Sequence, residues 1–244
     1  MEPVLALKNI YKDYADLKVL KGVSLSVEKG EVIVLIGPSG CGKSTLLRCI
    51  NGLEEINSGE IYLDGRLISN TRENLINVRK KVGMVFQSYD LFPHMKVMDN
   101  ILLGPMKAQK RDKKEVSCQA EALLARVGLA DKMRSYPSQL SGGQKQRVAI
   151  VRALCMNPEV ILFDEITAAL DPEMVFEVLE VVQQLADDGL TMVIVTHEMN
   201  FAKAVADRTM FMDNGLIVEE GIGVGFYESP QTERAHKFLN KFKF

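Results

Sequence analysis

The segment that most restricts the possible fold is GPSGCGKST, residues 37–45. It follows the longest apolar run in the chain, Val32 to Ile36, and it leads into STLLRCINGL, whose apolar residues recur with helical spacing. A buried strand, a glycine-rich turn and a helix in this order predict a phosphate loop, because glycines let backbone N–H groups surround a phosphate at a helix N-terminus. We therefore expect Lys43 to reach the β- and γ-phosphates of a nucleotide and Ser44 to bind Mg²⁺. The alternative is a glycine-rich turn without a ligand.

The whole loop is expected to contact the nucleotide. Its residues are Gly37, Pro38, Ser39, Gly40, Cys41, Gly42, Lys43, Ser44 and Thr45. Many enzymes contain such a loop, so this motif alone predicts a bound nucleotide and no particular reaction.

Composition narrows the class of protein. The chain has 244 residues, 47% of them apolar, and a net charge of −2, which fits one large globular domain and argues against a dedicated nucleic-acid binder. No apolar run approaches the roughly 20 residues of a membrane-spanning helix, and no secretory signal is visible. The four cysteines form no CxxC pair, which favours a reduced, cytosolic protein.

The order of expected elements predicts an α/β fold. Strands rich in Val, Ile and Leu fill the first 36 residues, and KVGMVFQ predicts a further strand that ends at Gln87. Residues 90–155 have helical periodicity, and strands return in EVILFDE and TMVIVTH. DPEMVFEVLEVVQQLADDG predicts a helix capped by Asp171, and TMFMDNGLIVEEG predicts a hairpin. The tail SPQTERAHKFLNKFKF predicts a short amphipathic helix. Alternating strands and helices favour a mostly parallel sheet with ligands at the carboxyl ends of its strands.

Two adjacent acids end the strand of ILFDE, where unpaired buried carboxylates would be costly. An Asp at the end of a strand downstream of a phosphate loop supplies a Mg²⁺ contact, so Asp164 is assigned that role. Glu165 is either a solvated acid or a general base that orients a water at the γ-phosphate. Mg²⁺ and Lys43 would offset the repulsion between the two carboxylates.

A second anion site is indicated by LSGGQKQR, residues 140–147. Ser141 is expected to cap the following helix, and the two glycines are expected to leave backbone N–H groups uncovered. Two phosphate sites and one nucleotide loop imply that one site is spare or that it serves another copy of the chain.

These three motifs, in this order, resemble the ATP-binding subunit of ABC transporters, and the resemblance covers essentially the whole chain. It implies a P-loop NTPase core with an N-terminal antiparallel β-subdomain (1–87 and 156–244) and a helical signature subdomain (88–155). It also implies a head-to-tail homodimer, in which each ATP lies between the phosphate loop of one copy and the signature of the other. The signature residues are Ser141, Gly142, Gly143 and Gln144.

Other family motifs assign further residues by the same resemblance. Tyr14 matches the aromatic residue that stacks on adenine, with Tyr11 as the competing assignment. Tyr14 is preferred because it is expected in the loop before the second strand. Gln87 matches the glutamine that touches Mg²⁺ or the water and senses the membrane partner. His197 matches the switch histidine at the γ-phosphate, although a lone histidine at a strand end is often structural. Asp171 matches the loop that crosses the dimer interface.

Two residues depart from the usual family pattern. Ile166 stands where the family usually has Pro, and Ala168 stands where it often has Ser. Ile166 restores a backbone donor that Pro lacks and is expected to loosen the turn, and Ala168 cannot make a hydroxyl hydrogen bond across the dimer. We expect these changes to weaken coupling between the two sites and to remove no reacting group.

Several stretches resemble the ATPases of polar amino acid importers in particular, among them VRKKVGMVFQSYDLFPHMKVMDNI and FYESPQTERAHKFL. The implied partners are a permease and, indirectly, an extracytoplasmic solute-binding protein, at the cytoplasmic face of the membrane. Leu91, Phe92 and Met95 are expected either in a local core or at the rim of a groove for a permease helix. The rivals are a regulatory, cell-division or lipoprotein-release ABC ATPase, a nucleic-acid-acting ABC protein, and a small-molecule kinase.

Overall fold

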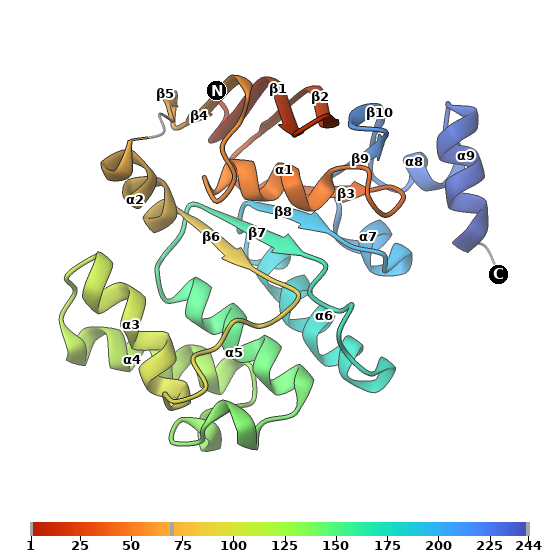
Figure 1. Cartoon of the computed structure of the whole chain (residues 1–244). Helices are drawn as coiled ribbons and strands as arrows, with labels where there is room; N and C mark the ends of the chain where they lie inside the picture. The colour runs from red at the N-terminus through yellow and green to blue at the C-terminus, as the bar shows by residue number, and fades with distance from the viewer. Residues whose placement is uncertain (1, 69–70, 243–244) are drawn as a thin grey trace.

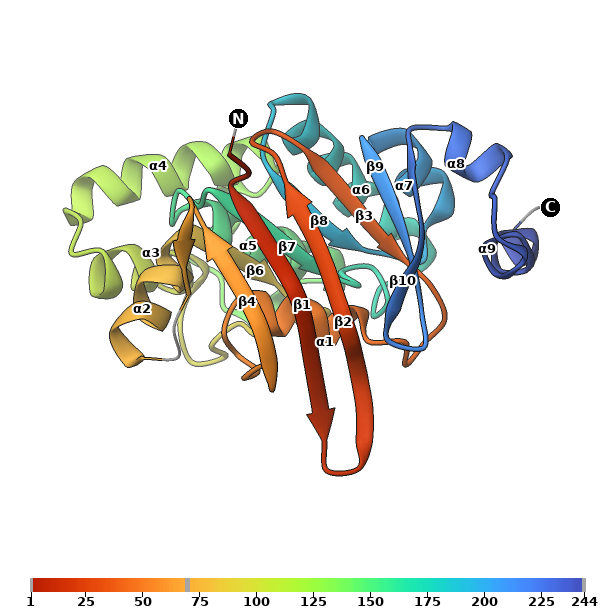
Figure 2. The ribbon, with the colours of Figure 1, turned by 90° about the horizontal axis from the view of Figure 1, so that it is seen from above.

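A computed structural model describes residues 2–68 and 71–242 and contains two sheets with one helix between them (Figures 1 and 2). The strands are β1 (Leu5–Tyr14), β2 (Leu17–Val27), β3 (Val32–Ile36), β4 (Ser58–Leu63), β5 (Arg66–Leu67), β6 (Val82–Val85), β7 (Val160–Asp164), β8 (Met192–Val195), β9 (Arg208–Asp213) and β10 (Leu216–Ile222). The helices are α1 (Lys43–Ile50), α2 (Arg72–Lys81), α3 (Val97–Ala108), α4 (Lys113–Arg126), α5 (Gly142–Leu154), α6 (Pro172–Asp187), α7 (Met199–Val205), α8 (Gly225–Glu228) and α9 (Glu233–Leu239).

The larger sheet is mostly parallel, as the sequence predicts. Its strand order is β10-β9-β3-β8-β7-β6, and only β10 at its edge runs antiparallel to its neighbour. The second sheet, β2-β1-β4-β5, is antiparallel. The predicted hairpin joins β9 to β10, with Asn214 and Gly215 both at positive φ, as a type I′ turn requires.

Side-chain alternation divides the core into two clusters, because successive residues of a strand face opposite sides of a sheet. From β3, Ile33 and Leu35 join the cluster that contains α1 and the antiparallel sheet. Val34 and Ile36 join the cluster that contains α3 to α7. Helix α1 therefore lies between the two sheets, and α5 and α6 lie on the opposite face of the larger sheet (Figure 1).

The predicted helical stretch contains α3, α4 and α5, and α3 packs against both of the others. Lys110 adopts a left-handed conformation in the loop that separates α3 from α4. No helix in the ranges 2–68 and 71–242 is long and apolar enough to cross a bilayer.

Three expectations need adjustment. The strand of KVGMVFQ ends at Val85 rather than at Gln87, and α2 was not anticipated, because its charged sequence has little apolar periodicity. Tyr14 is the last residue of β1 rather than a loop residue. The predicted tail helix forms as α9, and its expected last residues, 243–244, lie outside the described residues.

Candidate functional site

Lys43, Gln87, Asp164, Glu165 and His197 all follow or end strands at one edge of the larger sheet, where four neighbouring parallel strands end. β3 leads into the phosphate loop, β8 into His197, β7 into Asp164 and Glu165, and β6 into Gln87. This is the carboxyl edge, where open α/β sheets bind their ligands.

The phosphate loop forms with the conformation that its glycines allow. Gly37 lies at φ +149°, and a Cβ there would be 2.1 Å from the carbonyl oxygen of Met212, so a side chain is excluded. Gly40 and Gly42 also have positive φ. The Lys43 ammonium is buried and donates to the carbonyl oxygens of Gly37 (2.9 Å) and Pro38 (3.0 Å). The loop thus holds a positive charge at the N-terminus of α1.

The other loop residues differ in exposure. Ser39 and Gly40 are exposed, Ser44 and Thr45 are half-buried, and Cys41 is buried with its Sγ 3.8 Å from the Lys43 Nζ. Burial raises the pKa of the Cys41 thiol, which stays protonated at neutral pH.

Ser44 and Asp164 lie together, as expected of two ligands for one cation. The Ser44 Oγ donates to the Asp164 Oδ1 over 2.6 Å. Both line a cavity of 530 Å³ together with Gln87. Burial raises the pKa of Asp164. A bound cation would act in the opposite direction and favour the ionised carboxylate.

The donor set fits Mg²⁺. A hydroxyl, a carboxylate and an amide oxygen are hard ligands of the kind this ion takes, and Mg²⁺ usually binds one or two carboxylates plus substrate phosphates. In the described part of the chain, no group of three His, Cys, Asp or Glu side chains is placed to hold a metal ion.

Glu165 and His197 form the second pair. The His197 Nε2 is 3.2 Å from the Glu165 Oε1. This hydrogen bond, more than any other influence, lowers the pKa of Glu165. Glu165 is therefore a carboxylate at neutral pH and can only accept, so the proton of this hydrogen bond resides on the His197 Nε2.

The backbone of Glu165 explains how two adjacent acids reach different partners. Glu165 lies at φ 48°, a left-handed conformation that costs a non-glycine residue about 1–2 kcal/mol. Its N–H donates to the Val195 carbonyl and its own carbonyl accepts from the Ala168 N–H, both over 3.0 Å. The turn directs Asp164 to Ser44 and Glu165 to His197. Ile166 is buried in the core next to this turn, so the expectation that it loosens the turn finds no support in the packing.

Tyr14 lies closer to the phosphate loop than its competitor Tyr11. Burial raises the pKa of the Tyr14 phenol, and hydrogen bonds to Glu54 and Thr45 also affect it, which places the phenol beside the end of the loop. The Lys12 ammonium lies 4.6 Å from the centre of the Tyr14 ring. Tyr11 instead directs its hydroxyl toward Gly22. Tyr14 remains 41% exposed, so it is available to a ligand.

The signature forms the predicted cap at the start of α5. The Ser141 Oγ accepts from the Gln144 N–H, and the Gln144 side chain accepts from the Ser141 N–H. The expectation that both glycine amides are uncovered is wrong for Gly143, whose N–H donates to the Met174 Sδ over 3.4 Å. Sequence reasoning missed Met174, because nothing in the pattern of α6 indicates that its first turn meets α5.

Asp171 occupies the predicted N-cap position of α6. In the described structure its side chain makes no capping hydrogen bond. The expected capping contact is therefore absent, and the carboxylate is left for another partner.

The phosphate loop and the signature belong to opposite faces of the larger sheet. The apolar face of α1 packs in the cluster with the antiparallel sheet, whereas α5 packs in the cluster with α6. The described contacts of the signature are to Tyr89, Leu170 and Met174. The phosphate loop and the signature therefore start helices that pack in different core clusters.

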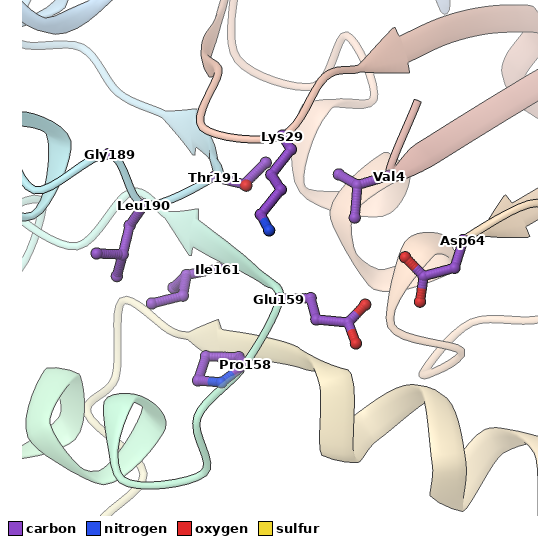
Figure 3. Close-up of a pocket in the computed structure, with 9 residues that line it drawn as sticks. All are labelled: Val4, Lys29, Asp64, Pro158, Glu159, Ile161, Gly189, Leu190 and Thr191. Carbon is purple, nitrogen blue, oxygen red and sulfur yellow. The ribbon is translucent and has the colours of Figure 1, made fainter. Parts of the chain in front are cut away.

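A further cavity, of 460 Å³, lies at the opposite edge of the sheet (Figure 3). It is lined by residues at the amino ends of β7 and β8 and by Lys29, Asp64 and Glu159. Lys81 pairs with both acids, at 2.5 Å and 2.8 Å. This seam between the two sheets contains none of the predicted site residues.

Comparison with known proteins agrees with this geometry. A family model described as "ABC transporter" matches residues 20–168, more than half of the chain. The chain is 52% identical to the glutamine transport ATP-binding protein GlnQ of Bacillus subtilis, over 98% of both chains. It is 50% identical to the glutamate/aspartate import ATP-binding protein GltL of Escherichia coli K12, over 98% of this chain and 99% of that one.

Solved structures of similar chains support the fold. The chain resembles cbiO1 of Clostridium perfringens, part of the ABC transporter complex cbiONQ, with a TM-score of 0.84, 28% identity and coverage of 99% and 96% of the two chains. It also resembles a dimeric post-hydrolysis state of the ATP-binding cassette MJ0796 bound to ADP and phosphate. That match has a TM-score of 0.80, 34% identity and coverage of 89% and 98%.

Proposed function

This chain belongs to the ABC transporter family, and from that membership we propose that it hydrolyses ATP between two copies of itself to drive the import of a polar amino acid. The observation that carries the proposal is the pair of contacts at the sheet edge, Ser44 to Asp164 and His197 to Glu165. They provide a cation site and a base next to a phosphate loop.

Phosphate binding is assigned to the loop and the start of α1. The buried Lys43 ammonium exchanges its two loop carbonyl partners for phosphate oxygens, which are stronger acceptors because they are charged. Ser44, Gln87 and Asp164 would hold Mg²⁺, which supplies charge neutralisation at the β- and γ-phosphates.

Attack on the γ-phosphate is assigned to a water held by Glu165. Its carboxylate is ionised and accepts the proton of that water as the water oxygen bonds to the γ-phosphorus and the bond to the β–γ bridging oxygen breaks, so that ADP leaves. His197 keeps the carboxylate in place through its Nε2 proton, and with ATP bound the same N–H would turn to donate to the charge that develops on the phosphate. Catalysis therefore rests on positioning and charge stabilisation.

The second copy is proposed to complete each site head to tail. Ser141, Gly142, Gly143 and Gln144 of one copy would face the phosphates bound by the other, and Asp171 would cross the interface. For the Gly143 amide to take part, the Met174 thioether must move away from it.

The proposed permease contact is the loop between β6 and α3. Phe92 is exposed, while Leu91 packs against the core and Met95 is half-buried, so the local core accounts for Leu91 and leaves the Phe92 ring for a partner. The buried Asn100 side chain bonds the backbone of this loop at Phe92, Met95 and Lys96. A preorganised rim with one exposed aromatic ring suits a short permease helix, at the cytoplasmic face of the membrane.

The importer assignment is tested by purifying the chain with the permease that co-purifies with it and placing the complex in lipid. With a solute-binding protein present, glutamine, glutamate or arginine is expected to raise ATP hydrolysis, whereas the Glu165→Gln complex shows no rise. An active ATPase that co-purifies with no permease and responds to no amino acid would favour a non-importer ABC ATPase instead.

Replacing Tyr14 with alanine is expected to weaken ATP binding by roughly 5- to 150-fold, because loss of base stacking on an aromatic ring costs about 1–3 kcal/mol. Tyr14→Phe retains the ring and should bind within two-fold of wild type. Tyr11→Ala is the matched control. Titration with a fluorescent ATP analogue measures all three, and a larger loss in Tyr11→Ala would reassign the stacking residue.

A further inference from the structure

The loop that follows Gln87 contains two consecutive left-handed residues. Tyr89 has φ 61° and Asp90 has φ 49°, and neither is a glycine. This conformation is unfavourable for both residues, so it needs support from surrounding contacts.

Arg152, in the last turn of α5, supplies that support. Its guanidinium donates to the Asp90 carbonyl (2.5 Å) and to the Tyr89 carbonyl (3.1 Å). Burial lowers the pKa of Arg152, yet the group stays charged, and hydrogen bonds from a charged donor are stronger than neutral ones. The segment after β6 is thereby fixed to the helix that starts with the signature (Figure 1).

The side chain of Tyr89 reaches a third element. Its hydroxyl donates to the Ala169 carbonyl over 3.2 Å, in the turn between Glu165 and Asp171. Burial raises the pKa of the Tyr89 phenol, and the nearby Asp171 carboxylate raises it further, so the hydroxyl keeps its proton. A Cβ added at Gly142 would lie 3.1 Å from the Tyr89 hydroxyl oxygen, so the phenol also lies close to the first residue of α5.

We propose that Tyr89 and Arg152 are positioning residues that couple the loop carrying Gln87 to the signature helix and to the turn carrying Glu165 and Asp171. The inference rests on the proposed ATPase function. A shift of the 91–96 loop by a permease moves Tyr89, and the Tyr89–Ala169 hydrogen bond passes that shift to the turn after Glu165. Through its hydrogen bonds to the Tyr89 and Asp90 carbonyls, Arg152 passes the same shift to α5, the helix that starts with the signature.

Tyr89→Phe tests the link, because it removes only the hydroxyl. In the permease complex, the kcat of ATP hydrolysis is expected to fall about five-fold, with the KM for ATP and the melting temperature unchanged. Hydrogen exchange in residues 165–171 is expected to become faster. Tyr62→Phe is the matched control, because it removes a phenol hydrogen bond to Glu60 in the antiparallel sheet, and it should change none of these values.

A double-mutant cycle separates coupling from independent effects. Arg152→Lys keeps the charge but loses the two-pronged contact with the Tyr89 and Asp90 carbonyls. Together with Tyr89→Phe it is expected to reduce kcat by less than the product of the two single effects. Multiplicative effects, an unchanged kcat, or a lowered melting temperature in Tyr89→Phe would overturn the link. A wild-type complex without ATPase activity would instead overturn the proposed function.

Discussion

Replacing Glu165 with glutamine should abolish ATP turnover and leave ATP binding intact. The amide oxygen can still accept the hydrogen bond from the His197 Nε2, so the packing of the pair is retained. The amide cannot take a proton from water, and loss of a general base costs about 10²- to 10⁴-fold in rate. Because ATP stays unhydrolysed between the two copies, the variant is also expected to accumulate as an ATP-bound dimer.

Phosphate release measures ATP turnover, and light scattering measures accumulation of the dimer. Glu198→Gln is the matched control, because Glu198 is the neighbour of His197 and the proposed chemistry does not use its carboxylate. The Glu198 backbone N–H donates to the Thr196 hydroxyl, and this hydrogen bond is kept in the variant. It should hydrolyse ATP at a rate within two-fold of wild type. Turnover near the wild-type rate in Glu165→Gln would remove Glu165 from the role of base.

The sequence predicts well that these side chains gather along one edge of the sheet, because each is carried by an apolar strand or by the loop after one. Lys43 follows the loop after β3, Asp164 ends β7 and His197 follows β8, and parallel strands place their carboxyl ends along one edge. Strand periodicity and chain order are local properties, so they can be read without knowing any long-range contact.

The sequence predicts poorly the contacts that join the loops after those strands. Tyr89, Arg152 and Met174 come from different parts of the chain and meet through turns with unusual backbone angles. The left-handed conformation of Glu165 has no signal in its residue type, because such angles usually indicate glycine or asparagine. These features depend on tertiary packing that periodicity does not encode.

Asp171 illustrates the same limit. Asp before Pro at the start of a helical pattern predicts a side-chain cap, and the position is correct, but the capping hydrogen bond does not form. Its carboxylate lies near the Tyr89 phenol instead. Asp171 thus occupies the N-cap position while its side chain interacts outside the helix.

Gly143→Asp and Lys43→Ala should each abolish ATP turnover alone and restore part of it when mixed. A Cβ at Gly143 would lie 3.0 Å from the Met174 Cβ, and an added carboxylate would repel phosphate at the N-terminus of α5. Lys43→Ala removes a charged donor to phosphate, worth about 1.5–3 kcal/mol of binding. In a mixed dimer, the intact loop of the Gly143→Asp copy meets the intact signature of the Lys43→Ala copy.

The mixed dimer therefore contains one complete site and one site with both defects. Co-purification with two different affinity tags isolates it, and its ATPase rate is expected to be measurable and at most half that of wild type. Gly225→Asp, a substitution of an exposed glycine at the start of α8 with no atom near its added Cβ, is the matched control for the added charge and should be active alone. If each chain used its own signature, both copies in the mixed dimer would be defective, and mixing would restore no activity.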